Sequence, residues 1–132
     1  KDAPQSINRI LDMFSIEERD SIRKSLSDVV KAIICQRLAK KASGKGVVPI
    51  TEIMINAPIV KKLIFDGRIE RLQQAIEANE EMGMMTFNQC LLKHYNAGDI
   101  SEEKALELSD NPQALRMNFK GIFLSDSGGI IQ

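Results

Sequence analysis

The sequence has little that would support a disulfide-rich, zinc-binding or membrane-spanning protein. Its 132 residues include two cysteines, one histidine, one tyrosine and no tryptophan. Cys35 and Cys90 are far apart and form no C-x-x-C pair, so we expect buried, reduced thiols and no metal site. No run approaches the roughly 18 apolar residues that a membrane-spanning helix needs. Because aromatic residues are scarce, the core is expected to be aliphatic.

The sequence also lacks an excess of charge of either sign. Eighteen basic residues balance eighteen acidic ones, which argues against a nucleic-acid binder that relies on bulk electrostatics, although a local basic patch is compatible with this balance. The apolar content of 43% is enough for a folded core. The length suggests one compact domain. The chain begins without a methionine and in mid-pattern, so we expect a piece of a longer protein.

The first 55 residues predict helices followed by a β-hairpin. Ser6 can cap a short helix, and Ser15 with Glu18 forms a capping box that opens an amphipathic helix over about residues 16–31. Two runs rich in β-branched residues then flank a glycine-bearing loop, which predicts a hairpin of residues 32–40 and 47–55. The alternative continues the helix through residue 41.

From residue 56 onward the pattern is helical. Apolar spacing, caps and glycines predict short helices at five places: from Pro58 to the turn at Gly67, over 68–80, from Thr86 to Gly98, over 102–108, and from Pro112 toward Met117. Residues 121–132 are expected to be a flexible tail. The residues alone therefore predict a mixed α/β chain with a helical second part.

No motif of a self-sufficient active site is present. The Gly44–Gly46 turn lacks the P-loop pattern, and His94 has no nucleophile at a useful spacing. More informative are Arg9, Arg37 and Glu52, polar residues inside apolar runs, because such groups are costly to bury unless they are paired or used. An arginine bonded to Glu52 is the structural interpretation, whereas contact with a nucleotide or a neighbouring subunit is the functional one.

Four segments carry a specific resemblance. They read SINRILDMFSIEERDSIRKSLSDVVKAIICQRL, VVPITEIMI, NAPIVKKLIFDGR and GMMTFNQCLLKHYNAGDISEEKALELSDNP. Their order and spacing resemble the C-terminal portion of the PilT-type retraction ATPases of type IV pili, members of the secretion ATPase superfamily. The third segment resembles that family's surface motif A-I-R-N-L-I-R-E-G.

The resemblance implies an α/β fold in which residues 1–55 are the end of a RecA-like ATPase core. Residues 56–120 would then form an all-α C-terminal domain. It also implies a hexameric motor that couples ATP hydrolysis, with Mg2+, to disassembly of pilin filaments and so to twitching motility. The Walker motifs would lie outside this chain. We therefore expect no catalytic residue here and no activity from this fragment alone.

The resemblance also implies partners and site residues. The partners would be the other subunits of a homo-hexamer and a platform protein at the pilus base, with no nucleic acid and only peripheral contact with the inner membrane from the cytoplasm. Arg9, Arg37 and Glu52 become candidates for nucleotide or subunit contacts. The retraction-motif surface would comprise Pro58, Val60, Lys61, Leu63, Ile64, Asp66 and Gly67. Phe65 departs from the family pattern, which has arginine there, and Lys61, Lys62 and Arg68 would form a local basic cluster.

Three alternatives remain at this point. A non-catalytic interaction module would dock a partner helix on the face of Ile59, Leu63 and Ile64. An accessory retraction ATPase would share the same motifs. A pilus-assembly or type II secretion ATPase would be expected to carry C-x-x-C zinc pairs, which this sequence lacks.

Overall fold

The chain folds into two compact units that each combine segments distant in sequence. The computed structural model describes residues 1–124 and 130–131. The first unit contains residues 1–35 and 52–86, and the second contains residues 36–51 and 87–132. The boundary predicted at residue 55 remains a prediction about the parent protein.

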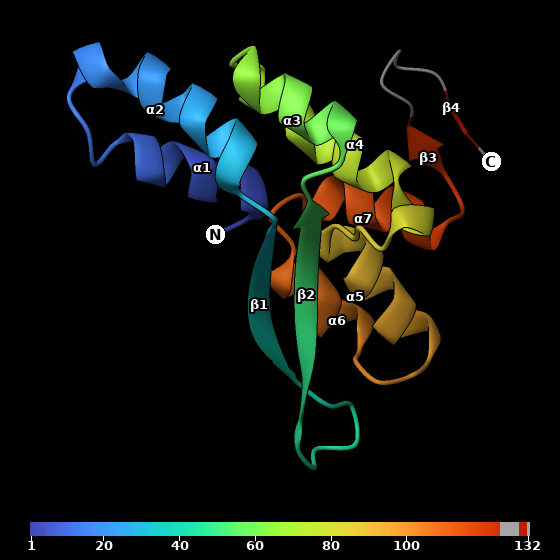
Figure 1. Cartoon of the computed structure of the whole chain (residues 1–132). Helices are drawn as coiled ribbons and strands as arrows, with labels where there is room; N and C mark the ends of the chain where they lie inside the picture. Colours follow the sequence, from blue (N-terminus) through green and yellow to red (C-terminus); the bar gives the residue numbers. More distant parts are fainter. Residues whose placement is uncertain (125–129, 132) are drawn as a thin grey trace. The chain divides into compact units, whose positions relative to one another are not determined.

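The first unit is mainly helical (Figure 1). Its helices are α1 (Ala3–Leu11), α2 (Ile16–Val29), α3 (Pro58–Phe65), η1 (Ile69–Arg71), α4 (Leu72–Ala78) and η2 (Glu80–Met82). Strands β1 (Ala32–Lys40) and β2 (Val47–Ile55) pair into a two-stranded sheet. Only the ends of the strands away from the loop, residues 32–35 and 52–55, belong to this unit. An aliphatic core joins α1, α3 and α4, with Ile7, Val60, Ile64, Leu72 and Ile76 fully buried.

The starts of the first two helices differ in detail from the prediction. Asp2, and not Ser6, caps α1, because its Oδ1 accepts a hydrogen bond from the backbone nitrogen of Gln5 at 2.8 Å. Ser6 lies within the helix and its hydroxyl donates to the Asp2 carbonyl. At α2, the Ser15 hydroxyl donates to the Glu18 carboxylate at 2.7 Å, so the two capping-box residues bond each other directly.

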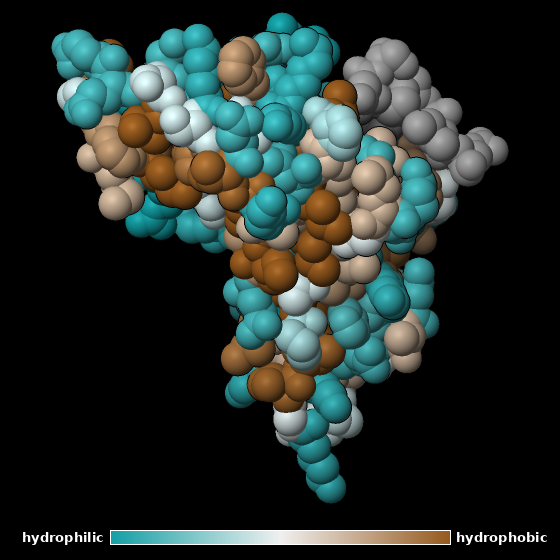
Figure 2. Space-filling view, in the orientation of Figure 1, coloured by the Kyte–Doolittle hydropathy of each residue, from teal (hydrophilic) through white to brown (hydrophobic). Residues whose placement is uncertain are grey.

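The predicted hairpin is confirmed and the helical alternative is wrong. Strands β1 and β2 cover the two β-branched runs, and residues 41–46 form the loop between them. Side chains of β1 alternate between exposed and less exposed positions, as expected for a pleated strand. Ile34, Leu38 and Val47 are large apolar residues that stay at least half exposed. Figure 2 shows hydrophobic side chains over this hairpin.

Among its described residues, the second unit contains three helices: α5 (Phe87–Asn96), α6 (Glu102–Leu108) and α7 (Pro112–Phe119). Its buried side chains include Ile50, Cys90, Leu91, Ala105 and Leu115. Two backbone contacts tie the hairpin into this unit: the Ala42 nitrogen donates to the Asp99 carbonyl, and the Thr51 nitrogen donates to Cys90 Sγ.

The end of the chain was predicted to be a flexible tail over residues 121–132. Within it, β3 (Phe123–Leu124) pairs antiparallel with β4 (Ile130–Ile131), with Phe123 opposite Ile131. Residues 125–129 and 132 lie outside the described part of the chain, so the prediction for them has no counterpart here.

Candidate functional site

Helix α3 carries the predicted retraction-motif surface, and local chemistry explains both of its ends. Ala57 precedes the helix in an extended conformation and Pro58 occupies the first turn, where its missing N–H costs nothing. At the other end, the Arg68 nitrogen bonds the Leu63 carbonyl and the Gly67 nitrogen bonds the Ile64 carbonyl. Gly67 has a φ of 74°, so this is the Schellman arrangement that glycine favours.

The structure divides the motif between core and surface. Val60 and Ile64 are 0% exposed and belong to the core of the first unit, so they are not surface residues as predicted. The reason is their four-residue spacing, which places them on one face of the helix, and that face packs inward. Leu63 also packs against the core, being partly buried.

The remaining motif residues, Pro58, Lys61, Asp66 and Gly67, keep some or all of their surface in solvent. The family role assigned to these positions stays a prediction.

The predicted basic cluster is neutralised by carboxylates. Lys61 Nζ lies 3.0 Å from Asp28 Oδ1, and Lys62 Nζ lies 3.0 Å from Asp66 Oδ2. Arg68 Nε pairs with Glu70 at 3.2 Å. All three pairs are solvent-exposed, and such pairs contribute about 0–1 kcal/mol each. The cluster therefore presents alternating charges and no strong positive field.

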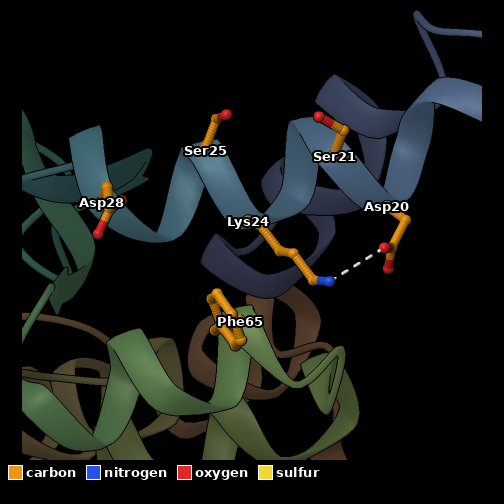
Figure 3. Close-up of a pocket in the computed structure, with 6 residues that line it drawn as sticks. All are labelled: Asp20, Ser21, Lys24, Ser25, Asp28 and Phe65. Carbon is orange, nitrogen blue, oxygen red and sulfur yellow. Dashed lines mark ion pairs between the residues drawn. The ribbon is translucent and has the colours of Figure 1, made fainter.

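A shallow groove of about 370 Å³ runs between α2 and α3. It is lined by Asp20, Ser21, Lys24, Ser25, Asp28 and Phe65 (Figure 3). Lys24 reaches across it, with its Nζ 3.2 Å from Asp20 Oδ2 and 5.5 Å from the centre of the Phe65 ring. Phe65 remains 47% exposed. The position where the family motif has a second arginine thus presents an aromatic face beside a paired lysine.

Glu52 is fully buried and holds the first unit together. Its Oε2 accepts a hydrogen bond from the Ala3 nitrogen at 2.7 Å, and its Oε1 accepts one from Gln73 Nε2 at 3.0 Å. A carboxylate at a helix N-terminus is stabilised by the helix dipole. Glu52 thus joins β2 to the start of α1 and to α4.

Arg37 lies in the second unit and pairs with a carboxylate of that unit. Its Nη1 donates to the Leu108 carbonyl at 2.5 Å, and its Nη2 lies 2.6 Å from Asp110 Oδ2. Its guanidinium carbon lies 4.0 Å from the centre of the Phe87 ring. These contacts fit the structural interpretation of Arg37, with Asp110 as its carboxylate. Arg9 is exposed on α1, whereas Glu52 in the same unit is buried.

Sequence reasoning missed Arg23, a residue of α2 that bonds the end of α3. Its Nε donates to the Ile64 carbonyl at 3.0 Å and its Nη2 donates to the Phe65 carbonyl at 3.1 Å. The available signal was its position beside Ile22, at the edge of the apolar stripe, where a long side chain can reach a neighbouring helix.

The two cysteines and the histidine lie in surroundings typical of structural residues. Cys35 and Cys90 are free thiols, half-buried and buried respectively, and burial raises the pKa of the Cys35 thiol. His94 Nδ1 lies 2.8 Å from Asp99 Oδ2. Within residues 1–124 and 130–131, no three His, Cys, Asp or Glu side chains are grouped as metal ligands, and no helix is long and apolar enough to cross a bilayer.

Comparison with known proteins finds relatives that are type IV pilus ATPases. No family model matches the chain. The type IV pilus ATPase PilU of Pseudomonas aeruginosa is 33% identical over 118 residues, which are 89% of this chain and 31% of PilU. The type IV pilus retraction ATPase PilT of the same organism is 35% identical over 111 residues, 84% of this chain and 32% of PilT. The chain therefore spans about a third of the length of these relatives.

The fold agrees with this homology. A crystal structure of the pilus retraction motor PilT with bound ADP matches with a TM-score of 0.72 at 33% identity, covering 86% of this chain and 31% of that one. The predicted α/β fold class, helix plus hairpin followed by helices, is confirmed by this match. By sequence and fold, the chain is therefore similar to one part of these pilus ATPases. Over most of its length it is homologous to the type IV pilus retraction ATPases PilT and PilU, as the sequence motifs indicated.

Proposed function

We propose that this chain is the C-terminal part of a motor ATPase that powers type IV pilus retraction and twitching motility. The observation that carries the proposal is identity of 33–35% to PilU and PilT over most of the chain, together with the match to ADP-bound PilT. The two identities are almost equal. The proposal therefore names the retraction class, including its accessory members.

In the parent protein, ATP and Mg2+ would be bound by segments outside this chain. The motor would be a homo-hexamer at the cytoplasmic side of the pilus base, touching the inner membrane only peripherally through a platform protein. The fragment by itself would not hydrolyse ATP, because none of its described residues forms a phosphate-binding loop or a grouped acidic metal site. Nucleic acid is not a proposed partner, because the net charge is zero.

The part that this chain contributes would be a coupling surface on α3. We define the α3 surface as Ile59, Lys61, Lys62, Phe65 and Asp66, five exposed side chains of this helix and its C-cap. The inward face of α3 packs in the core, so a partner would meet the outward face that carries these side chains. Their mixture of paired charges and one aromatic ring suits a moderate, reversible contact, which a cyclic motor requires.

The alternative of a helix-docking module receives less support. That hypothesis used an apolar face formed by Ile59, Leu63 and Ile64. Ile64 is 0% exposed and Leu63 packs against the core, so two of the three side chains already have partners inside the first unit.

The test uses the full-length parent protein with Lys61→Ala and Asp66→Ala, separately and together. Lys120→Ala is the matched control, because Lys120 is an exposed lysine at the end of α7 in the second unit. ATP hydrolysis is measured on the purified protein, and retraction is measured as twitching. We expect hydrolysis to persist and twitching to fall in the double variant, with the control unchanged. Loss of ATP binding in these variants, or normal twitching, would contradict a coupling role.

A further inference from the structure

The guanidinium of Arg23 makes three hydrogen bonds, and two of them connect α2 to α3. Besides the Ile64 and Phe65 carbonyls of α3, it reaches Asp20 Oδ1 on its own helix at 2.8 Å from Nη2. The Arg23 side chain is only 18% exposed. Its partners on α3 lie more than forty positions later in the sequence, so this is a tertiary connection and not a local helix pair.

The two α3 carbonyls that Arg23 bonds belong to the last turn of the helix. The last carbonyls of a helix have no partner within the helix. The turn at Gly67 supplies backbone donors for the Leu63 and Ile64 carbonyls, whereas the Phe65 carbonyl receives the Nη2 of Arg23. A positive charge at this end is also favoured by the helix dipole. Arginine suits the position because its planar fork addresses two adjacent oxygens at once.

Gly67 lies next to the guanidinium of Arg23. A Cβ atom built on Gly67 would lie 3.4 Å from both Cζ and Nε of Arg23, which is an ordinary van der Waals contact. Glycine is therefore favoured here by the left-handed conformation that ends α3, and not by the approach of the guanidinium.

Other polar links between α2 and α3 are weaker. The Lys61–Asp28 ion pair has side chains that are 52% and 70% exposed, and water screens such a pair. The Lys24–Phe65 contact is 5.5 Å long, at the outer range of a cation–π interaction. Core packing of Val60 and Ile64 holds the middle of α3. Arg23 is thus the polar group that fixes its C-terminal end, from which Phe65 and Asp66 project.

We propose that Arg23 is the positioning residue of the α3 surface: by bonding the last carbonyls of α3, it makes α2 and α3 move as one body. The inference rests on the proposed coupling role of α3 and adds what holds this surface in place. A force developed elsewhere in the motor and carried by α2 would then be delivered through α3 without fraying of its end.

The test uses the full-length parent with Arg23→Gln and Arg23→Lys. Glutamine removes the charge and the fork, whereas lysine keeps the charge and can bond one carbonyl. Ile76→Val serves as the stability control, because Ile76 is fully buried in α4 and does not line the groove. Unfolding stability, ATP hydrolysis, twitching and hydrogen exchange of the Gly67 and Arg68 amides are measured for each variant.

We expect R23Q to hydrolyse ATP normally, to lose twitching, and to exchange these two amides about tenfold faster through local fraying. R23K should show the same changes in weaker form, and Ile76→Val should twitch normally even where its overall stability is reduced. Normal twitching in R23Q would overturn the proposal, as would equal loss of twitching in Ile76→Val, which would assign the effect to stability.

The two proposals fail in different ways. If Lys61→Ala with Asp66→Ala stops twitching while R23Q does not, only the positioning role of Arg23 is wrong. If the α3 surface variants and R23Q all twitch normally, the coupling function itself is wrong.

Discussion

The carboxylate of Glu52 accepts a hydrogen bond from the backbone nitrogen of Ala3, with 2.7 Å between Oε2 and N. Forty-nine positions separate the two residues, and both are 0% exposed. The bond therefore fastens the first turn of α1 to strand β2 from within the core, where no water can replace it.

We expect Glu52→Ala to lower the free energy of unfolding by about 2–4 kcal/mol, because it leaves buried donors without their charged acceptor. Glu52→Gln should cost less, since an amide oxygen can still accept one of the bonds. Urea unfolding of the chain measures both values. Gln73→Ala is the comparison, because it removes only the Oε1 partner and should cost less than Glu52→Ala. Equal stability of Glu52→Ala and the parent chain would show that this bond is not structural.

Arg37→Ala should destabilise the second unit by about 2–3 kcal/mol, since it removes a charge-assisted bond and leaves the Leu108 carbonyl without its donor. Tyr95 is the sole tyrosine and its ring lies 4.4 Å from that of Phe119, centre to centre. Its fluorescence reports unfolding of this unit. Asp110→Ala, which breaks only the exposed ion pair, should cost less than 1 kcal/mol. A nucleotide-contact role for Arg37 predicts the opposite pattern, unchanged stability with altered nucleotide affinity in the parent.

Asn56 links β2 to the end of α2, because its Nδ2 donates to the Ser27 and Val30 carbonyls at 2.9 and 2.8 Å. Its buried Oδ1 has no hydrogen-bond partner among the described residues. We expect Asn56→Ala to cost about 2 kcal/mol through the two lost bonds. Asn56→Asp should cost more, because it places a second acceptor against two carbonyl oxygens. The order of the two urea midpoints checks this prediction, and the reverse order contradicts the assigned amide orientation.

The bond from Arg23, followed by that from Lys24, holds the pKa of Asp20 below its ordinary value of 3.8. A carboxyl whose pKa is lowered on folding stabilises the folded chain above the ordinary value, and the contribution disappears as the pH falls through the lowered pKa. We therefore expect Asp20→Asn to be less stable than the parent chain at about pH 6, and the difference to vanish as the pH falls through the lowered pKa. Urea midpoints across this range measure the difference. High salt should reduce it, because Asp20 is exposed. A difference that persists in acid would exclude the ionised carboxylate as its cause.

Much of the fold could be predicted because its signals are local. The β-branched runs on either side of a glycine-bearing loop gave both strands with correct ends. The helix over residues 102–108 and the turn at Gly67 also lie where the sequence predicts them. Each of these features depends on residues within a few positions of one another, so the residues that form the sequence pattern also cause the local structure.

The errors arose where distant residues decide the outcome. The helix predicted over residues 68–80 is divided into η1, α4 and η2, because packing of Leu72, Ala75 and Ile76 in the core fixes only its middle. The spacing of Val60 and Ile64 predicts that they lie on one face of a helix, but that face could contact either the core or a partner. Only tertiary packing decides that it contacts the core. The partners of Arg23 and Arg37 lie more than forty and seventy positions away, so periodicity cannot reveal them.

The division into units has a consequence for dissecting the protein. The chain passes from one unit to the other after residues 35, 51 and 86, so no single cut yields either unit intact. A truncation at residue 86 would leave the hairpin residues 36–51 without the rest of their unit. Isolating the first unit calls instead for a short linker in place of residues 36–51. Deletion variants of this region should therefore replace residues 36–51 with a linker, and should not simply end the chain at one position.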